Sequence, residues 1–177
     1  MALENKVLSK EILSKLYETG KTIATAESCT SGRIGESITS VPGASAYYKG
    51  GTICYADEIK SKVLGIDADL IAEKNAVSEE VPREMVKGII NLMDVDYAVA
   101  STGFAGPAAA PGIPVGTIYI ACGTKDDIRI IKLEGDEGRE ENLRNATHAG
   151  LKLFLEFLTE IYPEPSDMDQ VPKPEAR

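Results

Sequence analysis

Length, composition and charge place this chain among globular domains of ordinary size. Its 177 residues, 43% hydrophobic and 27% charged, suffice for one domain that buries roughly 70% of the surface its unfolded chain exposes. The net charge of −9 argues against nonspecific binding of nucleic acid, because such binding depends on Lys and Arg side chains that neutralise phosphates. No apolar run approaches the roughly 18 residues of a membrane span, and the N-terminus lacks a signal-peptide pattern. We therefore expect a cytoplasmic protein without nucleic-acid or membrane partners.

Three cysteines and one histidine limit the available chemistry. Cys29, Cys54 and Cys122 are odd in number and widely spaced, so neither a disulfide framework nor a zinc site is indicated. The single histidine, His148, makes Ser-His-Asp catalysis and a histidine-rich metal site improbable. We expect no metal and no cofactor.

The predicted elements alternate between helices and strands. In chain order they are a helix over 6–17, a strand over 22–26, a helix over 30–39, a strand over 50–55, a helix over 57–64, a helix from about 78 with Ser78 as its N-cap, a strand over 97–101, a hairpin of strands over 115–122 and 128–133, and a last helix from about 137. This order predicts a three-layer α/β/α sandwich with a mixed, mainly parallel sheet in one domain over 1–162. Residues 163–177 hold four of the nine prolines and are predicted to be a flexible tail.

Small or polar side chains follow three of the predicted strands. The clusters read ESCTSG over 27–32, YADEIK over 55–60 and STGFAGP over 101–107. The carboxyl ends of parallel strands meet at one end of a sheet, where open α/β sheets bind ligands. We therefore expect the three clusters to converge on one crevice.

Within that crevice, Ser28 and Lys60 form a candidate nucleophile–base pair. Without a usable histidine, a serine needs another base, and a desolvated lysine can lose its proton near neutral pH. Tyr55 precedes Lys60 by five residues and could orient a proton, and the Thr102 hydroxyl could complete the hydrogen-bond set.

Each of these residues also has a structural interpretation. Ser28 and Thr30 could be N-caps of the following helix, and Lys60 could be a solvated side chain. Cys29 is a rival nucleophile at the helix end, where the pKa of a thiol falls, or simply a small buried residue. The backbone N–H groups near Cys29 and Thr30 could form an oxyanion hole.

Two further features could bind an anion. The loop of Gly103, Ala105 and Gly106 can bring bare backbone close to a phosphate or a ring, although it lacks the spacing of the common phosphate-binding motifs. Arg139 and Arg144 flank the start of the last helix and could hold a phosphate, or could form salt bridges with neighbouring glutamates.

Six sequence blocks together resemble the CinA C-terminal domain family, and within it the single-domain nicotinamide-nucleotide amidohydrolases. The resemblance spans about residues 8 to 158, and its blocks follow in order and with compatible spacing: AESCTSG (26–32), VPGASAYYKGG (41–51), YADEIKSKVLGI (55–66), AVSEEV (76–81), STGFAGP (101–107) and PVGTIYIA (114–121).

The resemblance implies hydrolysis of the carboxamide of nicotinamide mononucleotide to nicotinate mononucleotide and ammonia, in pyridine-nucleotide salvage. The family's serine and lysine fall on Ser28 and Lys60, its tyrosine on Tyr55, and the hydroxyl residue before its GxAGP motif on Thr102. The substrate is then a pyridine nucleotide. A non-catalytic nucleotide- or partner-binding module and an amidase for another small amide are the alternatives.

The expected substrate contacts include positions where this chain departs from the family. Ser31 replaces a glycine of the family's ESCTGG block, and GDEGREENLR carries an apparent insertion that shifts the arginines. The apolar helix faces also allow a homo-oligomer. The expected contacts are Glu27, Cys29, Thr30, Ser31, Gly103, Ala105, Gly106, Arg139 and Arg144.

Overall fold

A mixed sheet of five strands forms the centre of the protein, and the computed structural model describes residues 2–17 and 19–163. The strands are β1 (Ile23–Glu27), β2 (Tyr48–Ile53), β3 (Tyr97–Gly103), β4 (Ile118–Gly123) and β5 (Ile128–Leu133). Their order across the sheet is β2-β1-β3-β4-β5. β1 pairs in parallel with β2 and β3, whereas β4 and β5 extend the sheet antiparallel. The carboxyl ends of β1, β2 and β3 therefore lie at one end of the sheet.

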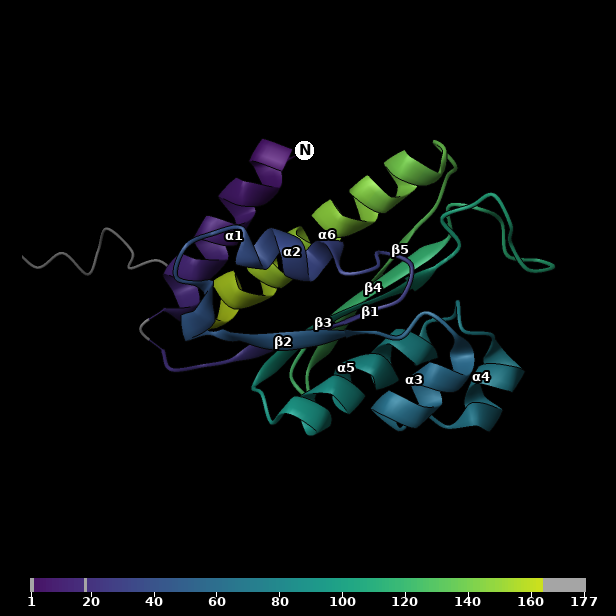
Figure 1. Cartoon of the computed structure of the whole chain (residues 1–177), viewed down its shortest axis with the longest axis horizontal. Coiled ribbons are helices and arrows are strands. Elements are labelled where there is room, and N and C mark those ends of the chain that lie inside the picture. The colour runs from purple at the N-terminus through teal and green to yellow at the C-terminus, as the bar shows by residue number, and fades with distance from the viewer. Residues whose placement is uncertain (1, 18, 164–177) are drawn as a thin grey trace, which may run out of the picture.

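Helices cover both faces of this sheet (Figure 1). One face carries α1 (Ala2–Leu16), α2 (Arg33–Thr39) and α6 (Arg139–Ile161), with α1 packed against α6. The other carries α3 (Asp57–Leu64), α4 (Ala68–Lys74) and α5 (Glu80–Met93), with α5 packed on β1, β3 and β4. A short 3₁₀ turn, η1 (Ala44–Ala46), precedes β2. The predicted three-layer α/β/α sandwich is confirmed.

Alternate side chains of the central strand β3 fill two separate cores. Val99 faces the α1–α2–α6 layer and shares its core with Phe154. Ala98 and Ala100 face the other layer and share a core with Met85 of α5. All five side chains are inaccessible to solvent. Burial on both faces explains why this strand reads as a continuous run of apolar residues.

The helix α4 was not predicted from the sequence. It has only seven residues, of which Ile71 alone is buried, so its pattern of apolar positions is too short to indicate a helix. The Asp67 side chain caps it by accepting a hydrogen bond of 2.9 Å from the N–H of Asp69. The capping signal was present in the sequence, but the apolar periodicity was not.

Several predicted boundaries were wrong by a few residues. α2 begins at Arg33 rather than at residue 30, because the intervening residues form a turn. Ser78 is not the N-cap of α5, which begins at Glu80 with Glu79 in that position. Of the predicted tail, residues 164–177 lie outside the described part of the chain. None of the helices in the described part is long and apolar enough to cross a membrane.

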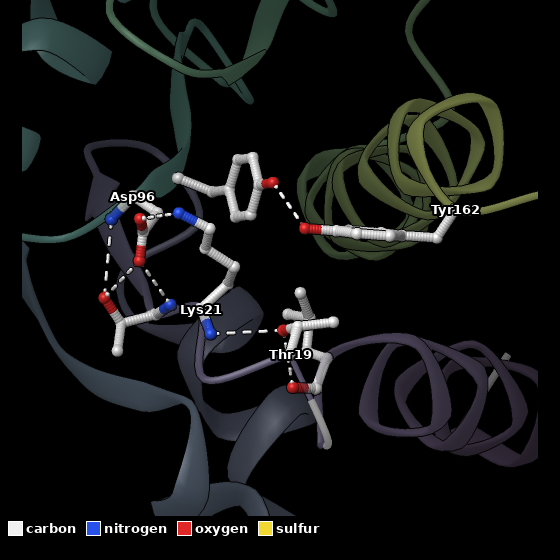
Figure 2. Close-up of polar contacts among 7 residues, drawn as sticks. Thr19, Lys21, Asp96 and Tyr162 are labelled. Atoms are coloured by element: carbon white, nitrogen blue, oxygen red, sulfur yellow. Dashed lines mark hydrogen bonds and ion pairs between the residues drawn. The ribbon is translucent and has the colours of Figure 1, made fainter.

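Asp96 ties the start of β3 to the start of β1 (Figure 2). Its carboxylate accepts hydrogen bonds from the N–H of Thr22 at 2.8 Å, the Thr22 hydroxyl at 3.1 Å and the Lys21 ammonium at 2.8 Å. Nearby, the hydroxyls of Tyr97 and Tyr162 are 3.0 Å apart. The Asp96 contacts join the starts of β1 and β3 at the end of the sheet opposite to the three polar clusters, and the tyrosine pair joins β3 to the end of α6.

Candidate active site

A cavity of about 500 Å³ lies at the carboxyl ends of β1 and β3. The three clusters that follow the parallel strands all contribute to it, and so does the start of α6, which confirms that these segments converge. Its walls are formed by Ser28, Cys29, Tyr55, Asp57, Lys60, Asn75, Ala76, Val77, Thr102, Gly103, Phe104, Ala105, Gly106, Pro107, Ala108 and Arg139.

Ser28 is the first residue after β1 and lines the cavity while almost buried. Its backbone N–H donates to the carbonyl of Ser101 at 3.0 Å, which fastens the end of β1 to β3. Its carbonyl accepts the N–H of Ser31 at 3.2 Å and so closes the turn. Because the N–H groups of Ser28 and Ser31 are used in this way, an oxyanion hole in this turn is restricted to the N–H groups of Cys29 and Thr30.

Lys60 is a lysine in the interior, with only 1% of its surface exposed. It lies on α3, which begins at Asp57 as predicted. Its Nζ lies 3.1 Å from the Asp57 carboxylate and 3.3 Å from the carbonyl oxygen of Tyr55. An ammonium has three N–H donors and a neutral amine has two. Two acceptors therefore leave one position on this nitrogen, whichever form it takes. The interpretation of Lys60 as a solvated side chain was wrong.

Tyr55 and Arg139 form the more exposed wall of the cavity. The Arg139 guanidinium donates to the carbonyl of Gly106 at 2.6 Å and to the Tyr55 hydroxyl at 3.4 Å. Tyr55 is 58% exposed, so its ring faces solvent at the cavity mouth. Arg139 therefore joins the start of α6 to two of the three clusters.

Thr102 is buried at the end of β3. Its hydroxyl donates to the carbonyl of Ala76 at 2.9 Å. The hydrogen of this hydroxyl is therefore used within the protein, and what remains for a ligand or a neighbouring donor is its acceptor capacity. Thr102 also anchors the segment between α4 and α5 to the sheet.

The loop of Gly103 to Gly106 is held by the buried side chain of Asn142 on α6. Its amide donates to the carbonyl of Ala105 at 3.0 Å and to the Asp136 carboxylate at 2.9 Å. The hydrogen bond from Asn142, together with one from the N–H of Gly138, holds the pKa of Asp136 below its usual value. The loop and the start of α6 are in this way fixed to each other.

Cys29 lines the cavity as a buried thiol. Burial raises its pKa to about 12, against the smaller opposing effect of the N–H groups of Cys29 and Thr30. Near neutral pH the side chain is therefore a thiol, which is a poor nucleophile. The chemistry of the site favours Ser28 over Cys29.

Glu27 and Thr30 lie behind the cavity wall, not on it. The Glu27 carboxylate is buried and accepts hydrogen bonds from the N–H groups of Gly32, Ile34 and Gly35 at 2.8 to 3.1 Å. It occupies the anion site that the start of α2 would otherwise offer to a phosphate. The substrate contacts expected of Glu27 and Thr30 therefore have no support in their placement. Gly32, rather than Ser28 or Thr30, is the N-cap of α2.

Ser31 and Arg144 are likewise not brought into the cavity. Ser31 is exposed, has a φ of 52°, and directs its hydroxyl towards the carbonyls of its own turn. Arg144 pairs with Glu141 at 3.0 Å and borders a separate groove of about 610 Å³ between α1, α2 and α6. Arg144 and Arg139 therefore line two different cavities.

The sequence placed Asp57 within a cluster that was expected to converge on the crevice but gave it no role there, and Asn75 and Val77 were missed as residues of the cavity wall. Asp57 was interpreted only as the start of a helix, although its spacing of three from Lys60 is the spacing of a helical ion pair. No signal pointed to Asn75, since α4 itself was not predicted. Among the described residues, no group of three or more His, Cys, Asp or Glu side chains could hold a metal ion.

The fold and the cavity define an α/β protein with a cavity at the carboxyl ends of parallel strands, and the buried polar side chains of Ser28, Lys60 and Thr102 lie in its wall. A family model of the CinA C-terminal domain matches residues 5–158, and the chain belongs to this family. The resemblance of the six sequence blocks is thereby confirmed.

The relatives are CinA-like and competence-associated proteins. A CinA-like protein of Gloeobacter violaceus is 36% identical over 154 residues, which cover 85% of this chain and 36% of the relative. A CinA-like protein of a Mycobacterium species is 43% identical over 135 residues, which cover 73% of this chain and 32% of the relative. The chain spans about a third of the length of these curated relatives.

Solved structures match over nearly their whole length. The competence damage-inducible protein A of Klebsiella pneumoniae superposes with a TM-score of 0.84 at 30% identity, covering 88% of this chain and 97% of that one. The competence/damage inducible protein CihA of Agrobacterium tumefaciens superposes with a TM-score of 0.83 at 28% identity, and the match covers 86% of this chain and 94% of that one.

Proposed function

We propose that this protein hydrolyses the carboxamide of nicotinamide mononucleotide to nicotinate mononucleotide and ammonia. The observation that carries the proposal is the buried Lys60 in the same cavity as Ser28. A lysine with 1% exposure is rare unless its amine is paired, because burial of a charged group is unfavourable, and here the partner is the Asp57 carboxylate at 3.1 Å. The family resemblance supplies the substrate.

The first step is attack of Ser28 Oγ on the carboxamide carbon. The serine proton passes to Nζ of Lys60, at the one position that its contacts with Asp57 and the Tyr55 carbonyl leave open, so this step requires the lysine to act in its amine form. The oxygen of the tetrahedral intermediate then carries the negative charge, and the N–H groups of Cys29 and Thr30 are the donors that would stabilise it.

The second half of the reaction releases the products. Lys60 returns its proton to the leaving nitrogen, the carbon–nitrogen bond breaks, and ammonia departs from the acyl-serine. Water then attacks the ester carbon and gives a proton to Lys60. As the ester bond breaks, Lys60 passes that proton to Ser28 Oγ, which restores the hydroxyl and releases the acid. The overall balance is one amide and one water to one acid and one ammonia.

The nucleotide portion would lie towards Arg139 and the Gly103 to Gly106 loop. Arg139 is a cation at the cavity mouth, and glycine residues let a phosphate approach the backbone. Since Glu27 occupies the start of α2, this proposal assigns the phosphate to the α6 side of the cavity.

The test measures ammonia release from nicotinamide mononucleotide by the wild type, Ser28→Ala and Lys60→Met. The methionine preserves most of the buried stem of the lysine and removes only the amine. Lys62→Met, an exposed lysine of the same helix, is the matched control. We expect turnover to be lost in the first two variants and retained in the third.

Three results would contradict the proposal. Undiminished turnover by Ser28→Ala would eliminate the serine mechanism. Calorimetric binding of the mononucleotide by the wild type without turnover would indicate a non-catalytic binding module, and turnover of a different amide in a substrate panel would reassign the substrate.

A further inference from the structure

Asn75, at the end of α4, has a backbone conformation that side chains rarely adopt. Its φ of 72° and ψ of 149° lie close to a region that only glycine enters readily. Such strain persists where the surrounding structure holds the residue in place, and it is concentrated at ligand sites. Asn75 is half-buried and lines the candidate cavity.

The side-chain amide of Asn75 is engaged at one end only. Its Oδ1 accepts a hydrogen bond of 3.0 Å from the backbone N–H of Val77. Because an N–H donor must face the oxygen, this bond identifies the other end of the amide as the Nδ2 donor. Within residues 2–17 and 19–163, Nδ2 has no hydrogen-bond partner.

The segment that carries Asn75 is fixed at the reacting end of the cavity. The carbonyl of Ala76 accepts the Thr102 hydroxyl at 2.9 Å. The neighbour of Thr102, Ser101, accepts the backbone N–H of Ser28 at 3.0 Å. Two successive hydrogen bonds thus join this segment to β3 and β3 to the end of β1, so Asn75 is held at the same end of the sheet as Ser28.

We propose that Asn75 is a specificity-determining residue whose Nδ2–H donates to an oxygen acceptor of the bound nucleotide amide. The identity of that ligand rests on the proposed function. The acceptor is either the carboxamide oxygen or an oxygen of the ribose phosphate, which offer the same lone-pair chemistry. Loss of a donor at the carboxamide oxygen lowers kcat, because that oxygen becomes the oxyanion. Loss of a donor to the ribose phosphate raises KM and leaves kcat unchanged.

The substitution Asn75→Gly separates this role from a structural one. Glycine adopts the same φ without strain and removes the amide. We expect the melting temperature to stay within about 2 °C of the wild type, because relief of strain offsets the lost bond to Val77. We expect kcat/KM for nicotinamide mononucleotide to fall by roughly 3-fold to 10-fold for one neutral hydrogen bond, or roughly 100-fold for an oxyanion donor.

Asp94→Gly is the matched control. Asp94 also follows a helix, α5, with a positive φ of 50°, but it is exposed and lies outside the cavity. Its replacement should leave kcat and KM unchanged. Asn75→Asp keeps an acceptor for Val77 and places a carboxylate where the donor was. Its loss of kcat/KM should exceed that of Asn75→Gly and shrink as salt screens the repulsion of the anionic substrate.

Two outcomes overturn the inference: unchanged kcat and KM in Asn75→Gly, or a loss that accompanies a lower melting temperature. Calorimetric titration with nicotinamide mononucleotide distinguishes a failure of this inference from a failure of the proposed function. If the wild type binds the nucleotide without turnover and Asn75→Gly binds it several-fold more weakly, the proposed hydrolysis fails and the role of Asn75 stands. If the wild type does not turn the nucleotide over, equal dissociation constants in the two proteins overturn the role of Asn75. If the wild type is an amidase, equal dissociation constants together with an unchanged kcat overturn it.

Discussion

The hydroxyl of Thr30 donates a hydrogen bond of 2.6 Å to the carboxylate of Glu27, inside the turn that connects β1 to α2. The same hydroxyl lies 2.7 Å from that of Ser101 on β3. Together with three backbone N–H donors, this contact makes Glu27 the internal anion of the α2 N-terminus. The carboxylate thus shapes the turn that presents Ser28.

Replacing Glu27 should destabilise the protein strongly. Glu27→Ala leaves the hydroxyl and N–H donors of the turn buried without an acceptor, which we expect to lower the free energy of unfolding by about 3–5 kcal/mol. Glu27→Gln keeps the shape of the side chain and one acceptor oxygen, so its free energy of unfolding should lie between those of the wild type and Glu27→Ala. Denaturant unfolding measures both, with Glu36→Ala, an exposed glutamate of α2, as the control. A stability loss no greater than that of the control would contradict this role.

The buried thiols should be unreactive and dispensable. Burial raises the pKa of Cys29 to about 12 and also raises the pKa of Cys122. A thiol-specific disulfide reagent at pH 8 should therefore label none of the three buried cysteines until the protein unfolds. Cys29→Ala should keep kcat within about 3-fold of the wild type, since the thiolate takes no part in the reaction. Rapid labelling of Cys29 in the native protein, with loss of turnover, would revive the cysteine as nucleophile.

Asp96 should make the free energy of unfolding depend on pH in the acidic range. Burial tends to raise the pKa of this carboxyl, but hydrogen bonds from Lys21 and Thr22 outweigh it and lower the pKa. A lowered pKa contributes stability that is present above the unfolded value, about 3.9, and is lost as pH falls through the folded value. Asp96→Asn should therefore cost about 1–2 kcal/mol at pH 7, and progressively less below pH 4.

The pH series for Asp96→Asn needs an exposed aspartate for comparison. Asp126→Asn, in the turn between β4 and β5, changes the net charge by the same amount at an exposed site. Its effect should stay within about 0.5 kcal/mol across the series. A difference between wild type and Asp96→Asn that persists undiminished at pH 2 would mean that shape, not charge, determines the effect.

Gly88 of α5 should tolerate no side chain. A Cβ at this position would overlap the backbone carbonyl of Leu64, at the end of α3. Gly88→Ala must therefore push the two helices apart, at a cost of about 1–3 kcal/mol. Because α3 carries Lys60, we also expect turnover to fall. Asn91→Ala, exposed on the same helix, is the control for both measurements, and wild-type stability in Gly88→Ala would show that α3 shifts freely.

The fold was largely predictable because most elements are long and strongly patterned. The apolar run of β3 predicts a buried strand, and the spacing of apolar residues in α5 and α6 predicts helices. The α-helix that was missed, α4, buries a single residue, Ile71. Strands that alternate with helices predict a parallel sheet, and a parallel sheet brings its polar carboxyl ends together. The convergence of Ser28, Lys60 and Thr102 on one cavity therefore followed from local signals.

What the chain alone could not decide is which side chains of those clusters face the cavity and which face the protein. Sequence determined that small hydroxyls, a thiol and a carboxylate crowd the turn after β1. Only the tertiary structure decided that the Glu27 carboxylate accepts hydrogen bonds from N–H groups at the start of α2. It also decided that Arg144 and Arg139 line different cavities, and that Asn75, at the end of an unpredicted helix, lies in the cavity wall. The physical reason is that hydrogen-bond donors buried by long-range packing must find acceptors, and that requirement is set by neighbours distant in sequence.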